Sequence, residues 1–466
     1  MIFDVAIGGA GVVGAAIARE LAEHHTTAVL VEAGDDVGAG TSKANTAILH
    51  TGFDAKPGSL EARLVRRGHA RLMEHGPRLG IPIERTGALL VAWTAEELAA
   101  LAGIASKAAE NGYAATHAVA MDALYGLEPS LGPGAIGALA VPDEHIVCPF
   151  TTPLAFATEA VVNGVALRLA SRVTAVHHDG DVHILDTTSG PVQARWVVNA
   201  AGLHGDTIDR LFGHARFTIT PRRGELIVFD KLARRLLGRT ILPVPTATTK
   251  GVLVAPTVFG NVVLGPTAED VQDRAATATT RDGLAALLTQ GHRTLPALAD
   301  EEVTATYTGL RAATDHGDYQ IFFHPDERYV CVGGIRSTGL TASMAIAEHV
   351  VDGLRDAGLA LVRRPDFQSI RMPNIGEAFS RPYADAARIA ADPDYGAIVC
   401  HCERTTLGEI RDATRAPIAA RSLDGLRRRT RAGFGRCQGF YCLADVVRLL
   451  AGATGRTAES ILGAQA

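Results

Sequence analysis

The sequence contains few aromatic residues and no excess of positive charge, and both shortages narrow what the protein can be. Aromatic residues make up 5% of the chain, whereas glycine is abundant at 49 residues. This balance suits an α/β nucleotide-binding protein and argues against disorder. The net charge of −5 provides no general affinity for nucleic acid or for an anionic membrane. At 466 residues the chain is too long for one hydrophobic core, so we expect two or three domains.

The N-terminus lacks the features of a secretory signal. Residues 5–18 are apolar, but they follow Asp4 rather than a basic stretch, and they contain four glycines. We therefore expect a cytoplasmic protein without a transmembrane segment. Peripheral association with the inner face of the membrane is compatible with this expectation.

Cysteine is also scarce, and its distribution is uneven. Cys148 and Cys331 stand alone among apolar residues, as buried structural thiols do. The other four form a C-x-C and a C-x4-C pair thirty-four residues apart: Cys400, Cys402, Cys437 and Cys442. Four thiolates are what a structural zinc ion or a [2Fe–2S] cluster requires. The single-residue spacer favours iron, because zinc sites usually use a two-residue spacer; zinc and disulfide bonds remain the alternatives.

The stretches VCHCERTTLGEIRDA and RRRTRAGFGRCQGFYC, which contain these cysteines, resemble the bacterioferritin-associated-ferredoxin type of [2Fe–2S] domain. The resemblance implies a small helical cluster domain at 397–466, with helices over 407–415 and 423–431. Five arginines crowd this region: Arg427, Arg428, Arg429, Arg431 and Arg436. We interpret them as a solvated helix face that balances the charge of the cluster, in preference to a docking patch for an acidic partner.

At the other end of the chain, Gly9, Gly11 and Gly14 form a G-x-G-x-x-G motif between an expected strand at 3–7 and an expected helix. The first glycine turns the chain, the second admits a pyrophosphate, and the third lets the helix pack on the strand. A second expected strand at 28–31 ends in Glu32, whose carboxylate can accept both ribose hydroxyls of an adenosine. The motif predicts a dinucleotide cofactor without deciding between NAD and FAD.

The following segment, GAGTSKANTAILHTGFDAKPGSLEARL, resembles flavoproteins of the D-amino-acid-oxidase superfamily, most closely their glycerol-3-phosphate oxidase and dehydrogenase group. RRGELIVF, TKGVLVAPTVFGNVVLGPTAED and VGGIRSTGLTAS belong to the same resemblance, which covers residues 1–362. It implies an α/β fold: a Rossmann-like FAD-binding domain with an inserted, mostly antiparallel β-sheet substrate domain. The expected FAD-binding segments are 1–80, 150–216 and 324–362, and the substrate domain is 81–149 and 217–323. Residues 363–396 are expected to be a linker that wraps back onto the flavoprotein.

The resemblance also implies where FAD is bound. Gly40, Thr41 and Ser42 form a small polar turn suited to the diphosphate, and the backbone near Val173 would contact adenine. The other implied contacts come from separated segments: Gly9, Gly11, Gly14, Glu32, Ala33, Asn45, Thr46, Asn199, Ala200, Ala201, Gly202, Gly334, Ile335, Arg336, Gly339, Leu340 and Thr341.

Four residues are candidates for catalysis. His50 lies in an apolar run, where a histidine is usually a satisfied core residue. It nevertheless matches the family's presumed base beside the flavin, and histidine's ordinary pKa of ~6.5 suits a base at neutral pH. Thr46 keeps a hydroxyl where the family commonly has serine. Lys250 and Arg311 match positions that bind the substrate phosphate, and Arg222 and Arg223 are further candidates for this anion pocket.

Together these features predict an FAD-dependent dehydrogenase that oxidises sn-glycerol 3-phosphate, a phosphorylated polyol, to dihydroxyacetone phosphate. Electrons would then pass through the cluster to a partner subunit or a quinone-linked carrier. The alternative substrates are 2-hydroxy acids such as 2-hydroxyglutarate, amino acids and secondary amines. Outside catalysis, the chain could be an electron-transfer subunit of a larger flavoprotein complex.

Overall fold

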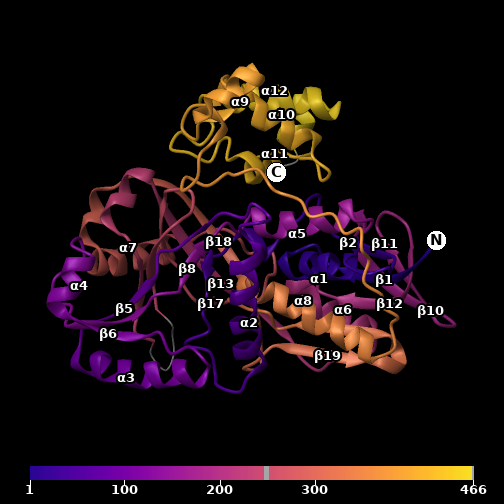
Figure 1. Cartoon of the computed structure of the whole chain (residues 1–466), viewed down its shortest axis with the longest axis horizontal. Coiled ribbons are helices and arrows are strands. Elements are labelled where there is room, and N and C mark those ends of the chain that lie inside the picture. The colour runs from indigo at the N-terminus through magenta and orange to yellow at the C-terminus, as the bar shows by residue number, and fades with distance from the viewer. Residues whose placement is uncertain (246–250, 464–466) are drawn as a thin grey trace.

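The computed structural model describes residues 1–245 and 251–463, and it shows two large lobes with a small helical domain seated on one side of them (Figure 1). The first lobe is built on a sheet in the order β10–β11–β12–β1–β2–β9, to which β20 and β19 are added beside β12. Five strands run parallel to one another: β1 (Ile2–Gly8), β2 (Ala28–Val31), β9 (Ala166–Arg168), β12 (Val192–Asn199) and β20 (Tyr329–Gly333). The antiparallel strands are β10 (Val173–Asp179), β11 (Val182–Thr187) and β19 (Gln320–His324).

Strand β2 is buried along its whole length because both faces of this sheet are covered. One face packs on α1 (Val12–Ala22), α5 (Thr151–Val162) and α8 (Gly339–Asp356), and α2 (Leu60–His75) packs on α8. The other face is closed by aromatic residues such as Phe212, which follows α6 (Gly205–Leu211). The expected Rossmann-like α/β domain is therefore confirmed.

The second lobe is a nine-stranded sheet in the order β17–β13–β16–β15–β14–β5–β7–β6, with β18 paired to β13. Every pairing in it is antiparallel except that of β14 with β5. Its strands are β5 (Ala88–Ala92), β6 (His117–Ala120), β7 (Gly137–Val141), β13 (Ile219–Phe229), β14 (Thr240–Pro243), β15 (Leu253–Pro256), β16 (Val262–Gly265), β17 (Glu269–Asp270) and β18 (Val303–Thr314). The helices of this lobe are α3 (Ala95–Glu110), α4 (Met121–Leu127) and α7 (Arg281–Thr294).

A small antiparallel sheet contributes strands from separated parts of the chain. It consists of β3 (Ile48–Leu49), β8 (His145–Val147) and β4 (Ile83–Glu84), with β8 in the middle. In the pairing of β3 with β8, Leu49 lies opposite His145. The sheet therefore fixes the segment after β3, which carries a candidate base, against the segment before β8.

The C-terminal domain contains the short hairpin β21 (Ile398–Cys400) and β22 (Thr405–Thr406), followed by α10 (Leu407–Arg415), α11 (Leu423–Thr430), α12 (Leu443–Thr454) and α13 (Ala458–Gly463). Helix α10 occupies the expected residues and begins with a capping box between Thr406 and Glu409. The next helix ends one residue before the prediction, because Arg431 adopts the left-handed conformation.

The connection at 363–396 lies along the flavoprotein, as expected for a linker that wraps back. The N–H groups of Arg364, Met372 and Glu377 donate to the carbonyl groups of Glu23, Leu79 and Val258, respectively. Near its end the connection forms the short helix α9 (Ala386–Ala391), which Asp385 caps at its N-terminal end.

The two isolated cysteines lie in the interior of the flavoprotein. Cys148 and Cys331 are fully buried, as expected for structural thiols. Across 1–245 and 251–463, no helix is long and apolar enough to cross a membrane.

The cluster domain is attached to the first lobe through a buried carboxylate, Asp36, in the loop after β2. Two arginines of α11 contact it: Nη2 of Arg428 lies 2.6 Å from Oδ2, and Nη1 and Nη2 of Arg429 lie 2.7 and 2.8 Å from Oδ2 and Oδ1. All three side chains are at most 5% exposed. Burial alone would raise the pKa of Asp36, but hydrogen bonds and charge from the two arginines hold it below its ordinary value.

Further contacts extend this seam toward the second lobe. Arg431 lies 4.0 Å from the ring centroid of Phe259 and donates to Oδ1 of Asn261 at 3.3 Å. Arg428, Arg429 and Arg431 are all buried, so the interpretation of these arginines as a solvated helix face is wrong. Sequence periodicity could not reveal this, because the partners Asp36 and Asn261 are far away along the chain.

We expect Asp36→Asn to loosen the cluster domain. It leaves two buried guanidinium groups without their carboxylate, and removal of one partner of a buried ion pair typically costs ~3–5 kcal/mol. Hydrogen exchange in α11 and proteolysis of the connecting segment should both become faster. Asp35→Asn, which removes the same charge from the exposed neighbouring residue, is the control. Unchanged exchange in the Asp36 variant would show that the seam does not depend on this carboxylate.

Candidate active site and metal centre

The glycine motif forms a tight turn between β1 and α1. Gly9 has φ +101°, and a Cβ on it would lie 2.6 Å from the carbonyl oxygen of Ala200. A Cβ on Gly14 would lie 1.9 Å from the carbonyl oxygen of Gly9, so only glycine lets α1 approach the turn this closely. Ser42 Oγ accepts the N–H of Val12 at 2.9 Å, which brings the 40–42 turn to the N-terminus of α1. A helix N-terminus beside two hydroxyls suits a diphosphate.

Glu32 holds the far side of the same loop. Its two carboxylate oxygens accept the N–H groups of Ala10 and Gly34, each at 2.7 Å. The carbonyl oxygen of Glu32 accepts the N–H of Ser171, which places the chain leading to Val173 beside the acid. The implied adenosine contacts therefore lie together, although their sequence positions are far apart. This glycine cradle and its donors fit an FAD molecule.

The implied contacts on the flavin side also converge. His50 N–H donates to Oγ1 of Thr341 at 2.9 Å, and this hydroxyl lies 3.3 Å from the carbonyl oxygen of Ile48. Thr341 is in the first turn of α8, so the helix start is fixed against β3. Thr46 precedes Ala47, a non-glycine residue with φ +58°. Backbone strain of this kind is concentrated at functional sites.

The His50 side chain has a buried acidic neighbour that sequence reasoning missed. Nδ1 of His50 lies 2.7 Å from Oε1 of Glu144, and Glu144 is 1% exposed. The other carboxylate oxygen accepts the N–H of Thr51 at 2.6 Å. The two residues are ninety-four positions apart, and no local motif signals their contact.

Arg311 differs from the other candidate cations. It lies on β18, which runs against the 41–45 segment: Leu310 accepts a hydrogen bond from Thr41 Oγ1 at 2.9 Å, and Tyr307 donates one to the carbonyl oxygen of Asn45 at 2.7 Å. In the described part of the chain, Arg311 forms no ion pair, and it donates one hydrogen bond, to the carbonyl oxygen of Thr267 at 2.9 Å. Burial, with a smaller contribution from Arg222, lowers its pKa to about 10.

The remaining candidate cations have protein partners or cannot be placed. Arg222 and Arg223 pair with Asp270 and Glu269 at 2.6 and 2.5 Å, so neither is a free anion ligand. Arg336 pairs with Glu61 at 3.0 Å through Nη2. Lys250 lies outside the described residues.

The four C-terminal cysteines come together. Cys402 interacts with Cys437 and Cys400, and Cys442 interacts with Cys400 and Cys437, through their thiols. Among the described residues, however, no three of these sulfurs lie within 4.8 Å of one another. A tetrahedral zinc site would bring all four within about 4 Å, because each Zn–S bond is ~2.3 Å. Four thiols gathered in one place, but spread more widely than one zinc ion requires, fit the two irons of a [2Fe–2S] cluster.

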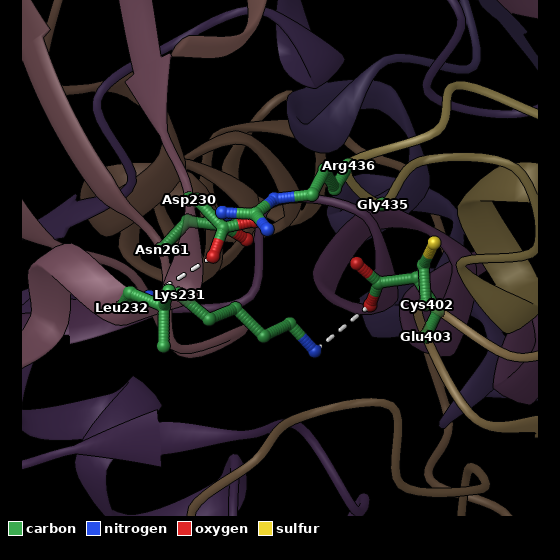
Figure 2. Close-up of a pocket in the computed structure, with 8 residues that line it drawn as sticks. All are labelled: Asp230, Lys231, Leu232, Asn261, Cys402, Glu403, Gly435 and Arg436. Atoms are coloured by element: carbon green, nitrogen blue, oxygen red, sulfur yellow. Dashed lines mark hydrogen bonds and ion pairs between the residues drawn. The ribbon is translucent and has the colours of Figure 1, made fainter. Parts of the chain in front are cut away.

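Backbone donors surround these sulfurs, as a negatively charged cluster requires. The N–H of Gly433 donates to Cys400 Sγ at 3.5 Å. The N–H groups of Tyr441, Gly439 and Phe440 lower the pKa of Cys437. Cys402 also lines a cavity of 260 Å³ in the seam between the cluster domain and the second lobe. Lys231 of the second lobe and Arg436 of the cluster domain line the same cavity (Figure 2).

Comparison with known proteins supports both halves of this arrangement. Residues 4–353 match the family model described as FAD dependent oxidoreductase, and residues 398–452 match the BFD-like [2Fe-2S] binding domain. A glycerol 3-phosphate dehydrogenase of Caloramator mitchellensis is 34% identical over 97% of this chain and 94% of its own length. One chain of the anaerobic glycerol-3-phosphate dehydrogenase of Escherichia coli K12 is 27% identical over 96% of this chain and 88% of its own.

Among solved structures, the FAD-bound L-alpha-glycerophosphate oxidase of Mycoplasma pneumoniae matches with a TM-score of 0.76. It is 28% identical, and the match covers 80% of this chain and all of that one. The four cysteines lie beyond residue 353, in the stretch matched by the cluster-domain model. The chain belongs to the family of FAD-dependent oxidoreductases and carries a C-terminal BFD-like [2Fe–2S] domain.

Proposed function

We propose that this protein oxidises sn-glycerol 3-phosphate to dihydroxyacetone phosphate and passes the electrons through its [2Fe–2S] cluster to an external acceptor. The relatives named for glycerol 3-phosphate cover both halves of the chain and support this substrate. The structural observation that carries the proposal is Arg311, a partly buried guanidinium with no ion pair among the described residues.

An arginine in this state is suited to bind an anion. A guanidinium has five N–H donors, and among the described residues one acceptor serves Arg311. Desolvation of an unpaired charge is costly. A dianionic phosphate bound here would pair with the charge of Arg311 and accept bidentate hydrogen bonds from it. Lys250 is proposed as the second phosphate ligand on the basis of the family resemblance.

Two side chains of the protein are proposed to act at the reacting end of the substrate. His50 is proposed to accept the proton of the C2 hydroxyl, and Thr46 to contact the same substrate region. FAD supplies the acceptor for the C2 hydrogen with its electron pair. C2 loses one proton from its hydroxyl and one hydride from carbon, so it becomes the ketone carbon of dihydroxyacetone phosphate.

Arg311→Ala should lower the specificity constant for glycerol 3-phosphate by an amount equivalent to roughly 2–4 kcal/mol of transition-state stabilisation, because a phosphate charge is left unpaired. Anaerobic bleaching of the flavin by glycerol 3-phosphate, glycerol, 2-hydroxyglutarate and amino acids measures this. Arg222→Ala, which changes the ion-paired arginine opposite Arg311, is the matched control. Equal bleaching of the wild type by glycerol and glycerol 3-phosphate would reject the phosphate assignment, and bleaching by 2-hydroxyglutarate alone would establish the alternative.

We further propose that the acceptor approaches the loop that closes the cluster. Phe440 and Tyr441, between two cysteine ligands, are 83% and 76% exposed, and their rings contact edge to face. Adjacent exposed aromatics are unfavourable in water and typical of interaction surfaces. The partner would be an electron-accepting subunit or a quinone-linked carrier met at the inner face of the membrane.

A Phe440→Ala/Tyr441→Ala double variant should lower turnover with washed membranes of the source organism by about tenfold or more, as expected for interface hot spots. Turnover with ferricyanide, a small soluble acceptor, should be unchanged. Phe379→Ala removes a half-exposed aromatic of the connecting segment and serves as the control. Full turnover of the double variant with membranes would place the acceptor surface elsewhere.

A further inference from the structure

The contact between His50 and Glu144 has a chemical role that the sequence motifs do not assign. We propose that Glu144 is a positioning residue: it holds the imidazole proton of His50 on Nδ1, so that Nε2 carries the lone pair that accepts the substrate proton. The inference rests on the proposed function for the identity of the substrate, but the state of the His50 ring can be measured without any substrate.

The local fold places Glu144 opposite His50. Strand β7 ends at Val141, and the N–H of Glu144 returns to the carbonyl oxygen of Val141 at 3.2 Å, with Pro142 at the second position of this turn. Proline is favoured there because its φ is preset. Strand β8 then begins at His145, which lies opposite Leu49 of β3. One residue further along this antiparallel register, Glu144 faces His50.

Both carboxylate oxygens of Glu144 are engaged by donors. Oε2 accepts the N–H of Thr51 at 2.6 Å, and Oε1 lies 2.7 Å from Nδ1 of His50. A backbone N–H can only donate, so Oε2 is committed to Thr51. An ionised carboxylate has no proton to donate, so the imidazole must supply the proton in the other contact. In neutral His50 the proton is therefore on Nδ1 and the lone pair on Nε2.

The same contact assists the chemistry after proton transfer. When Nε2 takes the hydroxyl proton, His50 becomes an imidazolium, and a buried carboxylate at 2.7 Å stabilises that charge. Glu144 keeps its own charge and does not accept the proton. Its near-complete burial limits screening by water.

Glu144→Gln separates this role from simple space filling, because glutamine has the same shape but only one acceptor oxygen. If that oxygen serves Thr51, the amide N–H₂ faces Nδ1 and forces the imidazole proton onto Nε2. If it serves His50, the Thr51 N–H is left facing a donor, which is unfavourable in a buried site. The first arrangement keeps both contacts, so we expect the tautomer of His50 to switch.

The first measurement is a long-range ¹H–¹⁵N spectrum of the oxidised holoenzyme labelled at histidine, with the His50 signals identified by their loss in His50→Ala. We expect an Nδ1–H tautomer in the wild type and an Nε2–H tautomer in Glu144→Gln. Glu144→Asp, which keeps both acceptor oxygens, should keep the wild-type tautomer. An unchanged tautomer in Glu144→Gln would overturn the proposal.

The second measurement is the limiting rate of anaerobic flavin reduction by glycerol 3-phosphate. Glu144→Gln should lower it by about a hundredfold or more, the usual share of general-base catalysis, with little change in apparent substrate affinity. Glu144→Asp should retain part of the rate. Asp143→Asn removes the neighbouring exposed charge, which contacts Tyr113 and not His50, and should leave the rate unchanged.

A double variant decides whether Glu144 acts through His50. In the His50→Ala background, Glu144→Gln should cause no further loss, since residues that act as a unit are not additive. Independent, multiplying losses would assign Glu144 a separate role and overturn the proposal. If the wild-type flavin is reduced by another substrate of the panel, the proposed function fails, whereas the tautomer of His50 still tests Glu144.

Discussion

The seam between the first lobe and the cluster domain of this protein is built around a buried carboxylate, Asp36. The loop that carries Asp36 also contains Glu32, whose carboxylate holds the glycine turn, and Gly38, whose N–H donates to the carbonyl oxygen of Ala10. On the other side, Arg428 and Arg429 belong to the helix between the two cysteine pairs. A buried ion pair adds little net stability, but it has one geometry, whereas an apolar surface can slide. We therefore interpret the pair as fixing how the cluster domain sits on the dinucleotide loop.

Arg311 differs from other arginines of the interior in the partners that the described residues supply. Arg19 pairs with Glu159 at 2.7 Å, Arg274 with Asp206 at 2.7 Å, and Arg431 with Glu403 at 3.0 Å. In each case the fold supplies the carboxylate that a desolvated guanidinium requires. For Arg311, the described residues supply only a carbonyl oxygen. The missing negative charge is therefore one that a ligand can provide, which is why this residue carries the substrate assignment.

Local sequence patterns predicted those parts of the fold that depend on the conformation of neighbouring residues. The turn between β1 and α1 follows from backbone conformations that only glycine allows, and the helix from Leu407 follows from a capping pattern spaced over three residues. Contacts between distant segments were not readable: Glu144 lies ninety-four residues from His50, and Asp36 lies 392 residues from Arg428. Arg428, Arg429 and Arg431 lie in an arginine-rich stretch whose composition is typical of a solvated surface. Their burial depends on whether the tertiary fold places hydrogen-bond acceptors beside them. The periodicity of the helix sequence does not indicate where those acceptors lie.

The cysteine region of the cluster domain contacts both lobes of the flavoprotein. Gly433, which donates to Cys400, precedes Phe434, and the Phe434 ring contacts Phe150 of the flavoprotein at 5.9 Å. Cys402 lines the cavity between the cluster domain and the second lobe (Figure 2). The cysteine region is therefore packed on the flavoprotein, whereas Phe440 and Tyr441, between two of its cysteines, are exposed to solution. A flavin that reacted directly with oxygen would need no cluster, so this arrangement favours a dehydrogenase with a separate acceptor over an oxidase.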